Sequence, residues 1–284
     1  MPRRGVVVCL FGLILFDIGM VTTANYPHRE EGWPYVNALS AFSDLADYLR
    51  AQPGYFRLFR NADDIAFNFG DWYGLDEFGG RGAGLTENMS AMNGPASSFG
   101  LLGVSYYLGR QPKYSDPEPL FRGRAGVNIY RVPGAFARAW AVHSIEVIHH
   151  PSERYEHANV PVDQLAQKTF VLGEAPTLER CDGQDAVRVT KVGTSEIQID
   201  ADMACRGMVV ASNNFFPGWR VEVDGAQSRI YEAYAFLQGV VVPSGHHKIR
   251  FHYFPLILFQ GLALAAAGLA GLALIYFGQR PRRS

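Results

Sequence analysis

The residue types best suited to ligand chemistry lie together in one glycine-rich stretch. Asn68, Asp71, Trp72 and Tyr73 fall within the sequence NFGDWYG. Sugars bind through aromatic faces and through polar side chains that fix their orientation, as small ligands generally do. The stretch reads as irregular, and functional side chains often lie on such loops. We therefore predict a carbohydrate contact at these four residues. The alternative is that Trp72 and Tyr73 belong to the core while Asn68 and Asp71 cap turns.

Histidines and acidic residues gather in a second stretch and raise the question of a metal site. His149, His150 and His157 lie close to Glu153 and Glu156. Their spacing matches no standard ligand set, so a solvated loop is the favoured interpretation. The sequence also contains no GxSxG, Walker, HExxH or CxxC motif. We therefore predict no catalytic residue, no cofactor and no metal.

A β-hairpin is predicted where two short runs of alternating apolar residues follow each other. Val187 and Val189 must share a face with Ile197 and Ile199, because partners across an antiparallel pair point the same way. Pairing 187 with 199 and 189 with 197 leaves 192–194 as the loop.

Continuing this register outward brings two of the three cysteines together. It places Cys181 opposite Cys205 on one face, and disulfides form readily outside the cytoplasm. We predict a Cys181–Cys205 bridge. If the strands end before residue 181, both remain free thiols. Cys9 lies in an apolar run and has no partner.

Both ends of the chain are apolar runs long enough to cross a membrane. They cover 5–24 and 255–277, and a spanning helix needs about 20 such residues. Arginines flank the outer side of each run, at 3 and 4 and at 280, 282 and 283. The positive-inside rule then places both tails, 1–4 and 278–284, in the cytoplasm and translocates 25–254.

Two features of these runs bear on their role. Asp17 lies within the first run and argues, with the run's length, against a signal peptide cut after Ala24. An ionisable group at membrane depth is typically a contact with a partner helix or a proton site, although Asp17 is also close enough to the outer interface for hydration. Small residues at 263, 267 and 271 permit close helix packing, although an Ala- and Gly-rich helix gives such rows by chance.

The segment between the two runs divides into two parts. Residues 25–100 predict an α+β, loop-rich subdomain with a short amphipathic helix over 42–52, and the chain is rich in Gly and Asn over 63–103. Residues 101–254 predict an antiparallel β-sandwich. Its candidate strands are 101–108, 126–132, 138–148, 186–191, 195–200, 206–212, 219–223, 228–231, 237–242 and 247–254. Asp224-Gly225 favours a two-residue type I′ turn that pairs Trp219 with Ile230.

Composition fits this organisation. Hydrophobic residues make up 48% of the 284 residues, enough for a packed core, and the net charge of −1 gives no support to a nucleic-acid partner. The fold class expected is a membrane-anchored α+β protein, in which two terminal transmembrane helices flank a mostly antiparallel β-sandwich outside the cytoplasm.

The stretch from Val209 to Pro255 resembles the C-terminal signature of the bacterial YfhO membrane-protein family. The matching phrases are VVASNNFFPGWRVEVDG and VVVPSGHHKIRFHYFP, followed by the last apolar run. Upstream, FRLFRNADDIAFNFGDWYGLDEFGG and VNIYRVPGAFARAWAVHS are similar to further family segments. Family members are polytopic and resemble GT-C glycosyltransferases, which transfer sugars from polyprenyl-phosphate donors to envelope polymers such as teichoic acids. Their catalytic acidic residues lie in an early external loop that has no counterpart here, so none is carried over.

The resemblance implies a non-catalytic extracytoplasmic module of a cell-envelope glycosyltransferase system in a bacterial cytoplasmic membrane. It would position a glycan polymer or polyprenyl-linked sugar. Its expected partners are membrane lipid, a polytopic membrane subunit and an envelope glycan. Two alternatives stay open: a structural protein that binds another envelope protein, and a C-terminal fragment of a split polytopic glycosyltransferase.

Overall fold

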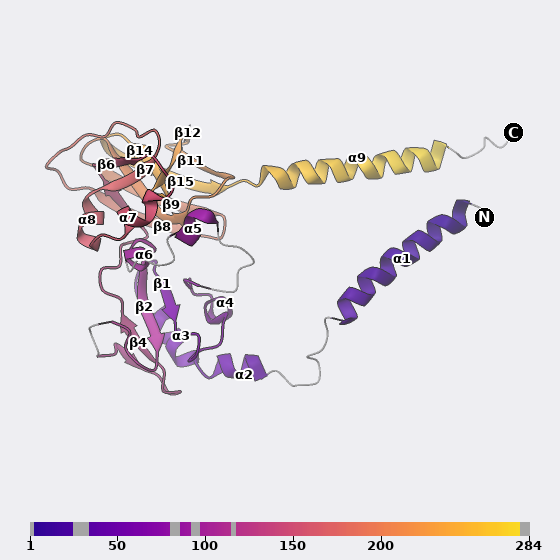
Figure 1. Ribbon diagram of the computed structural model, residues 1–284, viewed down its shortest axis with the longest axis horizontal. Helices are drawn as coiled ribbons and strands as arrows, with labels where there is room; N and C mark the ends of the chain where they lie inside the picture. The colour runs from indigo at the N-terminus through magenta and orange to yellow at the C-terminus, as the bar shows by residue number, and fades with distance from the viewer. Residues whose placement is uncertain (1–2, 25–33, 80–85, 92–96, 115–117, 279–284) are drawn as a thin grey trace.

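The computed structural model describes residues 3–24, 34–79, 86–91, 97–114 and 118–278 (Figure 1). The entry segment 25–33 and the arginines at 280, 282 and 283 lie outside the described residues. The chain is a mixed α+β protein built mostly of β-sheet. Helices α1 (Arg3–Ala24) and α9 (Leu256–Gly278) extend away from the folded body (Figure 1).

The two terminal helices differ in how well they suit a membrane. In α9, Leu256–Leu274 has a mean hydropathy of 2.0 and none of it is buried, so it is long and apolar enough to span. In α1, the apolar part of the described residues is the shorter segment Cys9–Met20. The expectation of one membrane-length helix at the C-terminal end is supported, whereas crossing by both helices stays a prediction.

A four-stranded sheet in the order β1-β2-β4-β3 forms one layer. Its strands are β1 (Arg57–Arg60), β2 (Val104–Gly109), β4 (Asn128–Arg131) and β3 (Phe121–Arg122). Helices α2 (Pro34–Ser40) and α3 (Ser43–Arg50) share a core with it, in which Leu45, Leu58 and Leu108 are fully buried. Helix α3 confirms the amphipathic helix predicted over 42–52.

The expected sandwich consists of a six-stranded and a five-stranded sheet. The first has the order β5 (Ala139–Val142), β10 (Gly207–Asn214), β14 (Leu237–Val242), β13 (Ile230–Ala233), β7 (Thr169–Leu172) and β6 (Ile145–Ile148). The second has the order β12 (Ala226–Ser228), β11 (Trp219–Val223), β15 (Gly245–Tyr253), β9 (Glu196–Met203) and β8 (Ala186–Val192). Their facing sides bury one apolar cluster that includes Val209, Val240, Ile249 and Phe251. Alternating residues of both sheets build this core, as in sandwiches generally.

The opposite face of the six-stranded sheet joins the four-stranded layer. Phe170 and Val210 on one side and Tyr107 and Tyr130 on the other belong to a single buried cluster. Short helices complete the fold: α4 (Phe69–Tyr73), α5 (Glu87–Ala91), α6 (Ser97–Leu101), α7 (Glu153–Ala158) and α8 (Val162–Gln167).

Three expectations about the sheets differ from the structure. Strands β2, β3 and β4 join β1 rather than the sandwich, so a boundary at residue 100 does not separate the sheets. The run 138–148 forms two strands, β5 and β6, at opposite edges of the six-stranded sheet. The pairs β1/β2 and β6/β7 are parallel, while the other pairs of named strands are antiparallel. Long-range pairings of this kind leave no local signal in the sequence.

The hairpin at Asp224-Gly225 confirms the predicted turn, with φ of 53° and 81° at its two central residues. Val223 pairs with Ala226 in the predicted register. The predicted pairing of Trp219 with Ile230 is wrong. Trp219 pairs with Tyr253 of β15, and Ile230 belongs to β13 in the six-stranded sheet.

The register predicted for the β8–β9 hairpin is wrong by two residues. Val187 pairs with Ala201 and Val189 with Ile199, and an irregularity follows between Val189 and Lys191. Because a two-residue shift preserves the face of every side chain, the apolar side still points into the sandwich. The Cys181–Cys205 disulfide is nevertheless present, and both cysteines lie just beyond the paired strands.

Candidate functional site

A pocket of about 820 Å³ opens beside the end of β1, and we call it the aromatic pocket. Strand β1, the segment 61–79 and the segment 107–113 supply its walls. Its lining includes Phe59, Asn61, Phe67, Phe78, Tyr107 and Lys113. The size and the mixture of aromatic and polar groups are typical of small-ligand sites.

The aromatic wall is organised around Phe59. Its ring lies 6.0 Å from the stacked ring of Tyr107 and 5.0 Å from the ring of Phe99. The ammonium of Lys113 sits over two of these rings, 4.5 Å from the centroid of Phe59 and 5.1 Å from that of Phe99. This cation–π geometry holds a positive charge at the pocket.

A buried ion pair is part of the lining of the aromatic pocket. Arg60 Nε lies 2.6 Å from Glu77 Oε1, and the two side chains are only 8% and 9% exposed. Glu77 also accepts a hydrogen bond from the backbone N–H of Gly70 at 2.8 Å, and Arg60 donates to the carbonyl of Ile65 at 2.9 Å. The ion pair thereby connects the segment 61–79 to β1.

Two titratable groups of the pocket are shifted by burial. Burial raises the pKa of Glu77, while the Gly70 N–H and the Arg60 guanidinium oppose the rise. Burial likewise raises the pKa of Tyr107, so its phenol stays neutral and keeps its O–H at neutral pH. The backbone at Gly70 is tight as well, because a Cβ there would lie 2.6 Å from the Cβ of Glu77.

The four residues predicted to contact sugar lie in the same segment as part of the pocket lining. None of the four is among the described residues that line the pocket. Asn68 adopts φ of 64° just before α4, and Asp71 is exposed. Trp72 is 50% exposed. Tyr73 donates its O–H to the carbonyl of Leu39 at 2.8 Å, which makes it a structural residue.

The sequence therefore predicts the segment that contributes to the pocket, but not the side chains that line it. Phe59 and Tyr107 lie in strands, where an aromatic residue is ordinarily predicted to belong to the hydrophobic core. Lys113 follows β2 and is far in sequence from the glycine-rich stretch NFGDWYG. Asn61 and Phe78 lie in or beside the segment, and their polar–aromatic mixture was the available signal.

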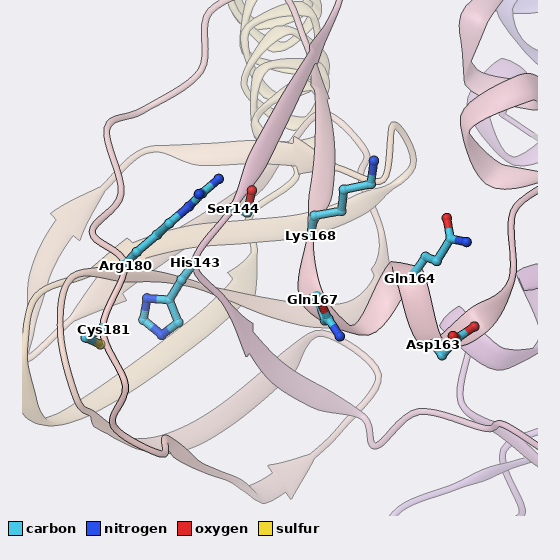
Figure 2. A pocket seen from close by; sticks show the side chains of 8 residues that line it. All are labelled: His143, Ser144, Asp163, Gln164, Gln167, Lys168, Arg180 and Cys181. Atoms are coloured by element: carbon cyan, nitrogen blue, oxygen red, sulfur yellow. The ribbon is translucent and has the colours of Figure 1, made fainter.

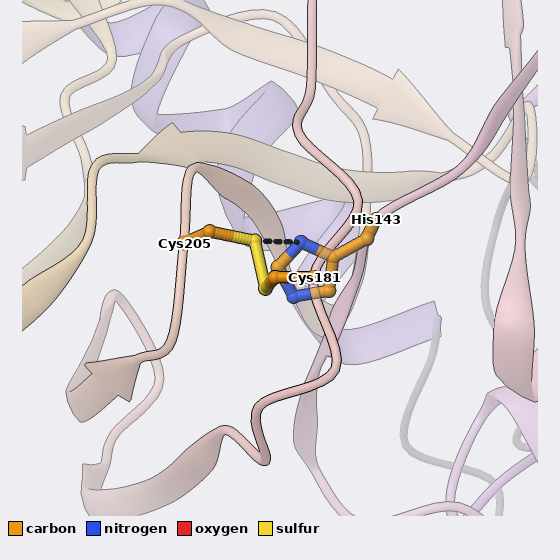
Figure 3. A group of neighbouring side chains, drawn as sticks. All are labelled: His143, Cys181 and Cys205. Carbon is orange, nitrogen blue, oxygen red and sulfur yellow. Dashed lines mark hydrogen bonds between the residues drawn. A yellow bond between two sulfur atoms is a disulfide. The ribbon is translucent and has the colours of Figure 1, made fainter.

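A second pocket, of about 560 Å³, lies beside the disulfide, and we call it the disulfide pocket. Its polar lining comprises His143, Ser144, Asp163, Gln164, Gln167, Lys168, Arg180 and Cys181 (Figure 2). Lys168 pairs with Glu146 at 2.7 Å. His143 lies between the ends of β5 and β6 and reaches the disulfide (Figure 3).

The histidine-rich stretch that raised the metal question makes ordinary contacts. The backbone N–H groups of His149 and His150 face the carboxylate of Glu153, at 3.4 and 2.9 Å. His157 lies 3.5 Å from Glu146. A different set, His143, Cys181 and Cys205, brings ligand-type atoms within 4.8 Å of one another, but the two sulfurs are bonded together.

No family model, curated protein or solved structure matches the chain. The resemblance to the YfhO family stays a proposal, as does the contact of Asp17 with a partner helix.

Proposed function

We propose that the chain is a membrane-anchored extracytoplasmic module that binds a cell-envelope glycan in the aromatic pocket, as a non-catalytic part of a YfhO-like glycosyltransferase system. The observation that carries this proposal is the aromatic pocket itself. The aromatic residues Phe59 and Phe78 and the polar residues Asn61, Tyr107 and Lys113 line one cavity. Saccharides need this combination, because they present apolar C–H faces beside many hydroxyls.

The charge of the pocket narrows the class of glycan. Arg60 and Glu77 neutralise each other, whereas Lys113 places its ammonium over aromatic rings at the pocket wall. A saccharide that bears phosphate or carboxylate gains a charge-assisted contact there. Anionic envelope polymers of the teichoic-acid kind fit this requirement.

The membrane end of the body supports the anchoring. Strand β15 ends at Tyr253 and α9 begins at Leu256. Around this junction the Tyr253 ring lies 5.7 Å from Trp219, and the Phe254 ring stacks on Phe259 at 4.8 Å. Trp and Tyr side chains gather at membrane–water interfaces because one end is apolar and the other polar, which suits Trp219 and Tyr253 here. We propose that both termini are cytoplasmic and that this junction lies at the outer interface.

A binding measurement tests the function. Full-length protein in lipid nanodiscs is titrated with purified teichoic-acid oligomers, and affinity is read by calorimetry. We expect Lys113→Met, which keeps an apolar stem, to weaken binding by about tenfold, because one charge-assisted contact is lost. Phe78→Ala is expected to weaken it at least as much.

Trp72→Ala is the matched control, since Trp72 is an aromatic residue of the same segment that is half-exposed and lies outside the described lining of the pocket. Its affinity should equal that of the wild type. If Trp72→Ala loses binding while Phe78→Ala keeps it, the site lies on α4 instead. If no glycan binds at all, the interaction-protein alternative takes the place of the proposal.

A further inference from the structure

The two sulfurs of the disulfide differ sharply in access. Cys181 is exposed and lines the disulfide pocket, whereas Cys205 is 9% exposed and lies in the turn between β9 and β10. Thiol–disulfide exchange requires a thiolate to reach one sulfur while the other sulfur leaves. Access therefore makes Cys181 the attacked sulfur and Cys205 the leaving one.

An imidazole stands beside the sulfur that would leave. His143 Nδ1 lies 3.6 Å from Cys205 Sγ (Figure 3). The same nitrogen is 3.0 Å from the carbonyl oxygen of Glu179, and Nε2 is 2.7 Å from Asp185 Oδ2. Asp185 therefore holds one ring nitrogen, and the other lies within hydrogen-bond reach of the Glu179 carbonyl. A proton on Nδ1 lies within reach of Cys205 Sγ as well as of the Glu179 carbonyl.

The surroundings fix this ring in place. Asp185 uses its other oxygen to accept a hydrogen bond from the backbone N–H of Ala204, at 2.9 Å, so the carboxylate is itself oriented. Gly207 packs under the ring, where a Cβ would lie 2.6 Å from His143 Cε1. A carboxylate that orients a histidine beside a sulfur is the arrangement that activates cysteine in many enzymes.

The disulfide pocket gives the attacking thiol a place to bind. Arg180 and His143 lie with Cys181 at one end of it, and Asp163 and Gln164 lie at the other (Figure 2). Arg180 places a positive charge at the end of the pocket that contains Cys181 (Figure 2). A small thiol that carries carboxylates is attracted to this end.

We propose that Cys181–Cys205 is a thiol–disulfide exchange site for small anionic thiols, with His143 assisting departure of Cys205. The incoming thiolate forms a bond to Cys181 Sγ while the Cys181–Cys205 bond breaks. The bonding electron pair goes to Cys205 Sγ, which takes a proton from His143 Nδ1. The thiol is oxidised to a mixed disulfide and Cys205 is reduced, so no further oxidant is needed. This site is independent of the aromatic pocket.

Reduced glutathione is the probe for the test. Folded full-length protein in nanodiscs is incubated with it, quenched with iodoacetamide at successive times and mapped by peptide mass spectrometry. We expect the glutathionyl group on Cys181 and the alkyl group on Cys205. Adducts on Cys205, equal adducts on both cysteines, or reaction only after denaturation would overturn the proposal.

The role of the histidine has its own readout. His143→Gln should slow adduct formation by at least roughly tenfold, less than the ~10²–10⁴ typical of a general acid because a thiolate already leaves well. His246→Gln is the matched control: His246 lies at the start of β15, pairs with the carboxylate of Asp202 at 3.2 Å as His143 pairs with Asp185, and should react like the wild type. Equal rates for the two variants would contradict the role of His143. The position of the adduct in the wild type decides the site even if His143→Gln folds poorly.

Discussion

Replacing Arg60 with Met is expected to lower the free energy of unfolding by about 3–5 kcal/mol, because it leaves a carboxylate buried without its partner. Glu77 is 9% exposed and faces Arg60 at 2.6 Å. Urea unfolding of the full chain in detergent, followed by tryptophan fluorescence, measures the change. Arg188→Met is the control: Arg188 is 80% exposed and lies 3.6 Å from Asp200. An exposed pair of this kind contributes about 0–1 kcal/mol.

The loss should depend on pH in a defined direction. The folded pKa of Glu77 is raised above its unfolded value, so the group favours the folded state at low pH and this stability is lost as pH rises through the folded pKa. Without Arg60 the folded pKa rises further. The cost of Arg60→Met should therefore be smaller near pH 4.5 than near pH 8. A cost that is the same at both values would contradict a buried ionised Glu77.

Replacing both cysteines, Cys181→Ser with Cys205→Ser, is expected to lower the free energy of unfolding by roughly 3 kcal/mol. The bridge closes a loop with a sequence separation of 24, and the unfolded chain gains conformational entropy when it is removed. The double variant is used because a single substitution leaves a reactive thiol. The wild type unfolded in reducing buffer is the matched comparison and should agree with the double variant.

A loss below about 1 kcal/mol would show that other contacts already hold the two segments together. The candidates are the backbone hydrogen bond from Glu179 to Arg206, at 2.9 Å, and the contact of Asp185 with Ala204. In that case the main role of the disulfide would be the proposed thiol–disulfide exchange rather than stabilisation of the fold.

Local chemistry made much of the sandwich predictable. Strands β11 and β14 were placed residue for residue, and the Asp224-Gly225 turn was correct because its two positive φ values suit Asp and Gly. The disulfide was also correct, although the register argued for it was not. An irregularity after Val189 shifts the register of the β8–β9 pair. The cysteines lie beyond the last paired residues of these strands, so their contact does not depend on that register.

The layout of the sheets and the pocket could not be predicted in the same way. The parallel pairing of β1 with β2 joins 57–60 to 104–109 across the short helices α4, α5 and α6, and no local pattern encodes it. The aromatic pocket depends on that pairing, since Phe59 comes from β1 and Tyr107 from β2. Trp72 is of a residue type that suits sugar binding, but in α4 it is half-exposed and lies outside the described lining of the pocket.

The most direct test of the proposed function is where a bound glycan lies. A teichoic-acid oligomer that carries a photoreactive diazirine is bound to the full-length protein in nanodiscs, irradiated and mapped by peptide mass spectrometry. We predict cross-links to the segments 59–79 and 107–113, which are competed away by unlabelled oligomer and reduced in Lys113→Met. Competed cross-links that fall instead on the sandwich, or on Trp72 alone, would contradict glycan binding in the aromatic pocket.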